Sequence, residues 1–207
     1  MSAAAKYRNE LGAAVTEKLG ADFKFLKSRQ EIRRKTQEGH DSIVLSGSSK
    51  FSPYISISFY FGVNFAKASA IEAKFLKGSE AACYHIHQYS LNRNHMAGLD
   101  YGGPFTWEIN LHDPKDIVQE LKAAIESMAF PFFERFSNLK VARDAKVGND
   151  SWCLGGDIFW HHILVMDMAL DDMAHFNEWK KTIKPFYAQQ ADVRILEIAS
   201  ALGAPSL

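Results

Sequence analysis

Two histidines two residues apart form the pattern closest to a metal site in this chain. His85 and His87 flank Ile86 in a stretch that is predicted to be a strand. Because side chains at i and i+2 of a strand lie on the same face, the two imidazoles could converge on one metal ion. Glu108, on the polar face of a second predicted strand, would supply a third ligand. His85, His87 and Glu108 are therefore a candidate metal site, and a set of polar residues on an open sheet face is the alternative interpretation.

Acidic and histidine residues also recur every four positions in the last quarter of the chain. Asp167, Asp171 and His175 would share one face of a continuous helix. The simpler interpretation is that Asp171 or Asp172 caps a new helix and that Asp167 faces solvent. This interpretation predicts a structural role for the acidic residues rather than a catalytic one.

The remaining reactive side chains stand outside any catalytic motif. His161 and His162 lie in an apolar segment, where we expect one hydrogen-bonded histidine at the edge of the core. Cys83 and Cys153 are the only cysteines and form no Cys-x-x-Cys pair, which predicts buried thiols in a reducing compartment. The nucleophile-elbow, Walker and His-Glu-x-x-His patterns are absent from the sequence. We therefore predict no catalytic residue and no cofactor.

The composition is that of an ordinary globular protein. The 207 residues include 24 Lys or Arg and 24 Asp or Glu, with 47% hydrophobic residues. This balance argues against nucleic acid as a partner, although a basic cluster from Lys27 to Lys35 could bind phosphate or an acidic protein. The first residues lack an apolar signal segment, and the apolar runs are too short to span a bilayer. We expect a cytoplasmic protein with no membrane partner.

The clearest structural signal is an unbroken alternation over residues 54–65. The apolar positions are Ile55, Ile57, Phe59, Phe61, Val63 and Phe65. The intervening positions are Tyr54, Ser56, Ser58, Tyr60, Gly62 and Asn64. Successive side chains of a strand project to opposite faces, so this pattern predicts one long strand at the centre of an antiparallel sheet. We expect Phe59 and Phe61 in the core and Tyr60 on the opposite, partly open face.

Helical spacing and turn residues place the other elements around this strand. We predict helices at 3–19, 66–76, 157–170, 172–183 and 187–202, and a helix that Asp113 caps and that Pro131 ends or kinks. Strands are predicted within 23–35, 42–46, 83–91 and 105–111, and a hinge within 143–151. The fold class is α+β: an antiparallel β-meander sheet covered on one face by helices, with a helical C-terminal third. We expect one domain over residues 1–207, which could divide into 1–142 and 152–207.

The first part of the chain resembles an uncharacterised bacterial domain family built from a helix and a β-meander. The likeness rests on Gly20-Ala-Asp-Phe-Lys-Phe, Ile43-Val-Leu-Ser-Gly-Ser-Ser-Lys and Ile55-Ser-Ile-Ser-Phe-Tyr-Phe-Gly-Val, within about the first 70 residues. Members of that family often occur near polymorphic-toxin loci. The resemblance implies an immunity or accessory protein rather than an enzyme.

These observations lead to a first hypothesis of a non-enzymatic, immunity-type interaction protein. Its partner would be a protein, bound by the polar sheet face and loops, because hydroxyl groups and tyrosines make adaptable contacts. Homo-oligomerisation stays open. The expected contact residues are Tyr54, Ser56, Ser58, Tyr60, Asn64, Arg33 and Arg34.

The rival hypothesis is a small-molecule- or metal-binding enzyme with a pocket between the sheet and the C-terminal helices. His85, His87, Glu108 and Tyr60 would line this pocket, and Tyr101 on a Gly-rich loop would act as a lid.

Overall fold

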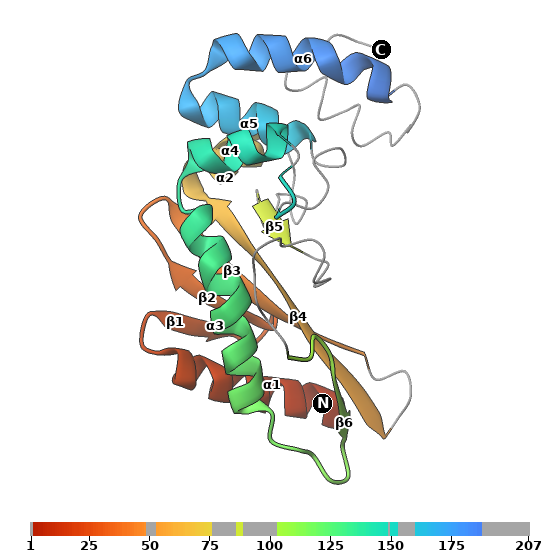
Figure 1. The fold of residues 1–207 in the computed structure, drawn as a ribbon. Helices are drawn as coiled ribbons and strands as arrows, with labels where there is room; N and C mark the ends of the chain where they lie inside the picture. Colours follow the sequence, from red (N-terminus) through yellow and green to blue (C-terminus); the bar gives the residue numbers. More distant parts are fainter. Residues whose placement is uncertain are drawn as a thin grey trace.

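A central antiparallel sheet with helices on one face and at one end forms the described part of the protein (Figure 1). The computed structural model describes residues 2–48, 53–75, 86–88, 103–148, 150–152 and 160–187. The strands are β1 (Phe23–Leu26), β2 (Glu31–Lys35), β3 (Gly39–Ser48), β4 (Tyr54–Phe65), β5 (Ile86–Gln88) and β6 (Trp107–Asn110). The helices are α1 (Ala3–Leu19), α2 (Ala66–Phe75), α3 (Val118–Arg135), α4 (Leu139–Val147), α5 (Trp160–Leu170) and α6 (Met173–Tyr187). The predicted α+β class is confirmed.

The predicted long strand is confirmed as the centre of the sheet. β4 spans all twelve residues of the alternation and pairs with β3 along ten of them. On its other side it pairs with β6 at one end and with β5 toward the other. The strand order is β1-β2-β3-β4-β5, with β6 also paired to β4, and every pairing is antiparallel.

The apolar face of β4 packs under α3, and α1 packs against α3 and β1. Phe61 is fully buried, and its ring centroid lies 5.1 Å from that of Phe132 and 6.1 Å from that of Phe133. Phe132 in turn contacts Phe136, 4.7 Å away between centroids. This aromatic layer decides one of the two outcomes predicted at Pro131, where the helix was expected to end or kink. The helix does not end there, because buried side chains on both sides of that residue hold α3 in one piece to Arg135.

The start of α3 also differs from the prediction. Asp113 does not cap it; the helix begins five residues later, at Val118. The intervening segment is held in a non-helical path by two hydrogen bonds. Tyr7 of α1 donates its hydroxyl to the Lys115 carbonyl at 3.1 Å, and the Asp116 carboxylate accepts from the Val118 amide at 2.9 Å. A long-range contact therefore overrides the local capping signal.

The hinge predicted within residues 143–151 does not include residues 143–147, because these belong to α4. The Asn138 side chain caps α4 by accepting from the amides of Lys140 and Val141. Glu38, in the turn between β2 and β3, accepts from the Leu139 amide at 2.8 Å. Two oxygen acceptors, one of them far away in sequence, thus satisfy the first amides of this helix.

α2, α4, α5 and α6 form a helical end beyond the edge of the sheet, in the upper part of Figure 1. α5 packs against each of the other three helices. The helix predicted for residues 187–202 lies outside the described residues, as do Cys83 and Cys153. We call α2, α4, α5 and α6 the helical end, and the sheet with α1 and α3 the sheet half.

Candidate functional site

The alternate residues of β4 share their face with hydroxyl and acidic residues of the neighbouring strands. Ser56 lies opposite Ser48 of β3 and Glu108 of β6. Ser58 lies opposite Ser46. We define the polar sheet face as Tyr54, Ser56, Ser58 and Tyr60 of β4, Ser46 and Ser48 of β3, and Glu108 of β6.

Exposure along β4 confirms the predicted two-sided strand. Phe59 and Phe61 are 2% and 0% exposed, whereas Tyr60 between them is half-buried. Tyr54, at the open end, is 49% exposed. The face closes toward the other end of the strand: Asn64, expected as a contact residue, is 6% exposed and accepts from the Ser69 hydroxyl at 2.8 Å. The accessible part of the polar sheet face is therefore its Tyr54 end.

The two arginines predicted to join this face lie on opposite sides of the sheet. Adjacent residues in a strand point in opposite directions, so Arg33 lies on the polar side and Arg34 on the helix-covered side. Arg33 binds the nearly buried Glu31 carboxylate through Nε at 3.1 Å and Nη2 at 2.9 Å. The Ser42 hydroxyl donates to the same carboxylate. Arg33 is thus held within the sheet at some distance from Tyr54.

Arg34 belongs to the packing of the helix-covered face. Its guanidinium lies 5.3 Å from the ring centroid of Phe23 and 5.6 Å from that of Phe133. It also donates to the Asp41 carboxylate at 2.6 Å. Burial raises the pKa of Asp41, and the hydrogen bond from Arg34 offsets part of that rise. Arg34 is accordingly a structural residue rather than a contact residue.

The strand register separates two of the three predicted metal ligands. His87 lies opposite Gly62 of β4, whereas Glu108 lies opposite Ser56. Six residues of strand correspond to roughly 20 Å, far more than two ligands of one ion can span. His85 and the lid residue Tyr101 lie outside the described residues. Across the part of the chain that the structure describes, no three His, Cys, Asp or Glu side chains gather as a metal site.

A buried charged network joins the helices of the helical end, where the sequence predicted a solvent-facing aspartate. Asp167 of α5 is 0% exposed. Its Oδ1 accepts from Arg143 of α4, and its Oδ2 lies 2.8 Å from Nδ1 of His175 on α6. The prediction for Asp167 is wrong because α5 is packed between neighbouring helices and has no solvent-facing side at this position. Asp167 and His175 meet across the break between α5 and α6 rather than on one continuous helix, and the sequence pattern did not indicate Arg143 as their partner.

The helical backbone is interrupted between α5 and α6, and this interruption shows which of the two predicted residues caps α6. Asp172 accepts the His175 amide at 3.1 Å and so caps α6. Asp171 adopts a left-handed backbone with φ 58° and pairs at the surface with Lys67, 3.3 Å away. Asp171 therefore does not join the buried network.

Arg143 binds three aspartates through its planar guanidinium. Besides Asp167, it donates to Asp144 at 2.7 Å and to Asp172 at 3.1 Å. Burial opposes its charge, but its hydrogen bonds to Asp172 and Asp144, together with the attraction of the nearby carboxylates, outweigh that effect and raise the pKa of Arg143. The His175 amide and Arg143 lower the pKa of Asp172. We name Arg143, Asp167, Asp172 and His175 the Arg143 network.

Burial dominates the electrostatics of the central carboxylate. It raises the pKa of Asp167, and hydrogen bonds from His175 and Arg143 offset part of that rise. Asp144, at the exposed edge, behaves in the opposite way: against the effect of burial, hydrogen bonds from Lys140 and Arg143 lower its pKa. Arg143 therefore donates hydrogen bonds to two acids whose pKa values shift in opposite directions, because one acid is buried and the other is exposed.

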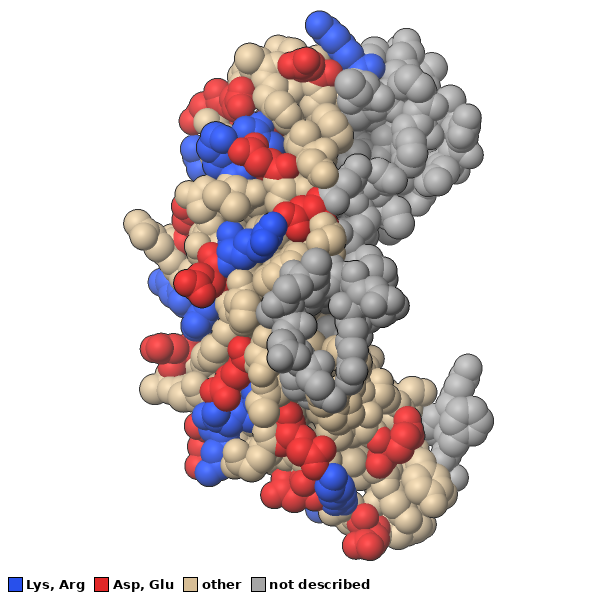
Figure 2. Space-filling model, in the orientation of Figure 1, with Lys and Arg blue, Asp and Glu red and all other residues tan. Residues whose placement is uncertain are grey.

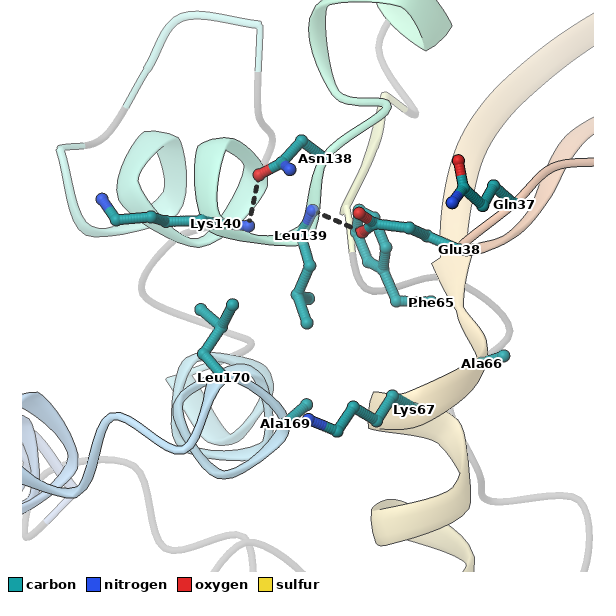
Figure 3. A pocket seen from close by; sticks show the side chains of 10 residues that line it. All are labelled: Gln37, Glu38, Phe65, Ala66, Lys67, Asn138, Leu139, Lys140, Ala169 and Leu170. Carbon is teal, nitrogen blue, oxygen red and sulfur yellow. Dashed lines mark hydrogen bonds between the residues drawn. The ribbon is translucent and has the colours of Figure 1, made fainter.

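A cavity of about 380 Å³ lies where the sheet meets the helical end (Figure 3). Apolar side chains of Phe65, Leu139 and Leu170 meet polar side chains of Glu38 and Lys67 around it. This is the region in which the rival hypothesis expects a pocket. The residues predicted to line that pocket, however, are not among those that line this cavity.

Comparisons with protein-family models, with curated protein sequences and with solved structures found no significant match. In the part of the chain that the structure describes, no helix is both long and apolar enough to cross a membrane. Basic and acidic side chains are interspersed over the described part of the face seen in Figure 2.

Proposed function

We propose that the protein acts by binding a partner protein through the Tyr54 end of the polar sheet face. The observation that carries this proposal is the 49% exposure of Tyr54 on a strand whose opposite face is completely packed. The hydroxyl residues around it contribute nothing to the aromatic core beneath the sheet. A tyrosine with neighbouring serines offers apolar area and hydrogen-bonding groups at a small cost in side-chain entropy.

The chemistry of the face indicates a partner with a polar, hydrogen-bonding surface. Ser46 and Ser48 are exposed beside the half-buried Ser56 and Ser58. Glu108 adds an exposed negative charge at the β6 side. We further propose an immunity-type role in the cytoplasm, with a toxin protein as partner, on the strength of the family resemblance of the first part of the sequence.

The proposal is tested by affinity capture from the native host with the full chain as bait, followed by titration of the recovered partner. Tyr54→Asp should weaken binding by about 2 kcal/mol or more, the range of an interface hot spot. Met173→Asp is the matched control, because Met173 is also 49% exposed but lies on α6. Absence of a stoichiometric partner, or equal binding by both variants, would contradict the proposal.

The cavity supports a second candidate function, the binding of a small molecule between the sheet and the helical end. Its volume of about 380 Å³ lies within the usual range of ligand pockets. A small-molecule screen by melting temperature tests this function. Ligands that stabilise the wild-type protein should lose their effect in Gln37→Trp, since Gln37 is exposed on the cavity rim and a larger ring there would fill the opening.

A further inference from the structure

The Arg143 network determines which nitrogen of His175 carries the hydrogen. Asp167 Oδ2 lies 2.8 Å from Nδ1 of His175, while Oδ1 accepts from Arg143. An ionised carboxylate only accepts hydrogen bonds, so the contact requires a hydrogen on Nδ1. In the neutral imidazole, Nε2 then carries the lone pair.

Two contacts orient the imidazole ring, and a third anchors the backbone that carries it. Asp167 holds Nδ1, and the ring of Trp179 stacks on the imidazole with centroids 6.2 Å apart and planes within 10°. The backbone amide of His175 is bound to the Asp172 carboxylate at the start of α6. A ring held in this way loses little further freedom when Nε2 engages a substrate.

Nε2 is the group left available by this arrangement. The His175 side chain is 27% exposed, and no described residue forms a hydrogen bond with Nε2. Asp167, which fixes the ring, is itself fully buried and tied to Arg143. Fixed orientation, a defined tautomer and an accessible lone pair are the properties that a general base requires.

We infer that His175 is a general base that activates water for the hydrolysis of small activated acyl esters. Nε2 takes a proton from water as the water oxygen forms a bond to the acyl carbon. The bond between that carbon and the leaving oxygen then breaks, and the imidazolium returns its proton to the leaving group or to solvent. The products are a carboxylic acid and an alcohol or phenol, so the step needs no oxidant, reductant or further reactant.

The other members of the site are positioning residues. Asp167 selects the tautomer and stabilises the imidazolium that forms during the step. Arg143 keeps Asp167 paired on the oxygen that His175 does not use. Trp179 sets the plane of the ring. This site lies in the helical end, away from the Tyr54 end of the sheet, so its failure and the failure of the proposed binding function are separately measurable.

The first test follows hydrolysis of p-nitrophenyl acetate by the full chain. His175→Gln should lower the rate constant by about 10²-fold or more, the contribution of a positioned general base. His112→Gln is the matched control and should leave the rate unchanged, because His112 is exposed and lies outside the Arg143 network. The wild-type rate should also fall in deuterated water, since a proton moves from water in the step. Equal rates for wild type and His175→Gln would overturn the inference.

The second test starts from the wild-type protein, so its first measurement does not depend on any variant folding. Nitrogen-15 NMR of the wild-type protein, at a pH where His175 is neutral, should place its ring hydrogen on Nδ1. Asp167→Asn should slow ester hydrolysis and abolish this preference, an effect that a merely structural link between α5 and α6 does not predict. A ring hydrogen found on Nε2 in the wild-type protein would overturn the inference, whatever the kinetic result.

Discussion

The sheet half and the helical end are stabilised by different chemistry. Under α3, the sheet half buries aromatic rings against one another, with Phe59, Phe61 and Phe132 at 2% exposure or less. In the helical end both partners of an ion pair are buried, with Arg143 at 3% and Asp167 at 0% exposure. The buried carboxylates of the sheet half, Glu31 and Asp41, pair instead with arginines that are 30% and 32% exposed. An apolar core tolerates change in proportion to the volume removed, whereas a buried charge depends on its partner.

The two cores also differ in whether they contain groups that could take part in a reaction. Rings on the packed face of β4 have no groups that can exchange protons. The Arg143 network retains polar groups that cost free energy to bury, and in return it fixes one imidazole. The helical end, whose core contains buried charges, is therefore the region where we infer a reaction.

The largest effect is expected from breaking the buried ion pair. Asp167→Ala should cost about 3–5 kcal/mol of unfolding free energy, because it leaves the buried Arg143 charge without its fully buried partner. Urea unfolding provides the measurement. Asp144→Ala is the control: that side chain is 50% exposed and contacts the same arginine, so its loss should cost about 0–1 kcal/mol.

A double substitution sharpens the same comparison. Arg143→Met with Asp167→Leu should recover most of the stability lost in Asp167→Ala, since a well-packed apolar pair often replaces a buried ion pair without loss. Failure to recover would show that the helical end depends on the Arg143 network for its packing rather than only for its charge balance.

In the sheet half, the corresponding substitution is Phe59→Ala. Its ring contacts Phe61 at 6.0 Å and Trp107 at 6.4 Å between centroids. We expect a loss of about 3–5 kcal/mol from the cavity left behind. Tyr60→Ala, on the half-buried opposite face, should cost clearly less in the same unfolding experiment. Equal losses would mean that β4 is as tightly packed on both sides, and binding through the polar sheet face would fail with it.

Capping residues should give a smaller difference between the two regions. Asn138→Ala should cost about 1 kcal/mol, because Asn138 accepts from two amides at the start of α4. Ser2→Ala should cost less, because Ser2 accepts from one amide of α1, at 3.3 Å and in an exposed position. Thermal unfolding of both variants checks the order, and a larger loss for Ser2→Ala would contradict it.

The smallest expected effect is the pH dependence of the helical end. Asp144 and Asp172 have lowered pKa values in the folded protein, so the stability they contribute is complete above their usual pKa of about 3.9 and is lost as pH falls through the lowered value. Asp167, with a raised pKa, acts in the opposite sense, and its contribution declines as pH rises from the usual value through the raised one. Urea midpoints across this acid range should show a shallower acid loss for Asp144→Asn and Asp172→Asn, and a steeper one for Asp167→Asn.

Local pattern was sufficient for the sheet half. The period-two alternation over residues 54–65 predicted β4 at its observed length and assigned Phe59 and Tyr60 to opposite faces. β1 and β2 also lie within residues 23–35, where strands were predicted, although the turn that joins them contains no glycine. Alternation is a strong signal because a one-residue shift would expose every apolar side chain of a half-buried strand. The same signal does not indicate which residues pair across the sheet. For this reason Arg33 and Arg34 were both assigned to the polar face, and Asn64 was expected to be exposed.

The sequence by itself determined the fold class, the central strand and the hydroxyl groups that one face of that strand presents. Only the tertiary structure decided where the chemistry lies. It separated His87 from Glu108 through the strand register, extended α3 past Pro131, and brought Arg143 to Asp167 across 24 residues of sequence. The physical reason is range: side-chain periodicity is set by neighbours along the chain, whereas the pairing of buried charges is set by which helices pack together.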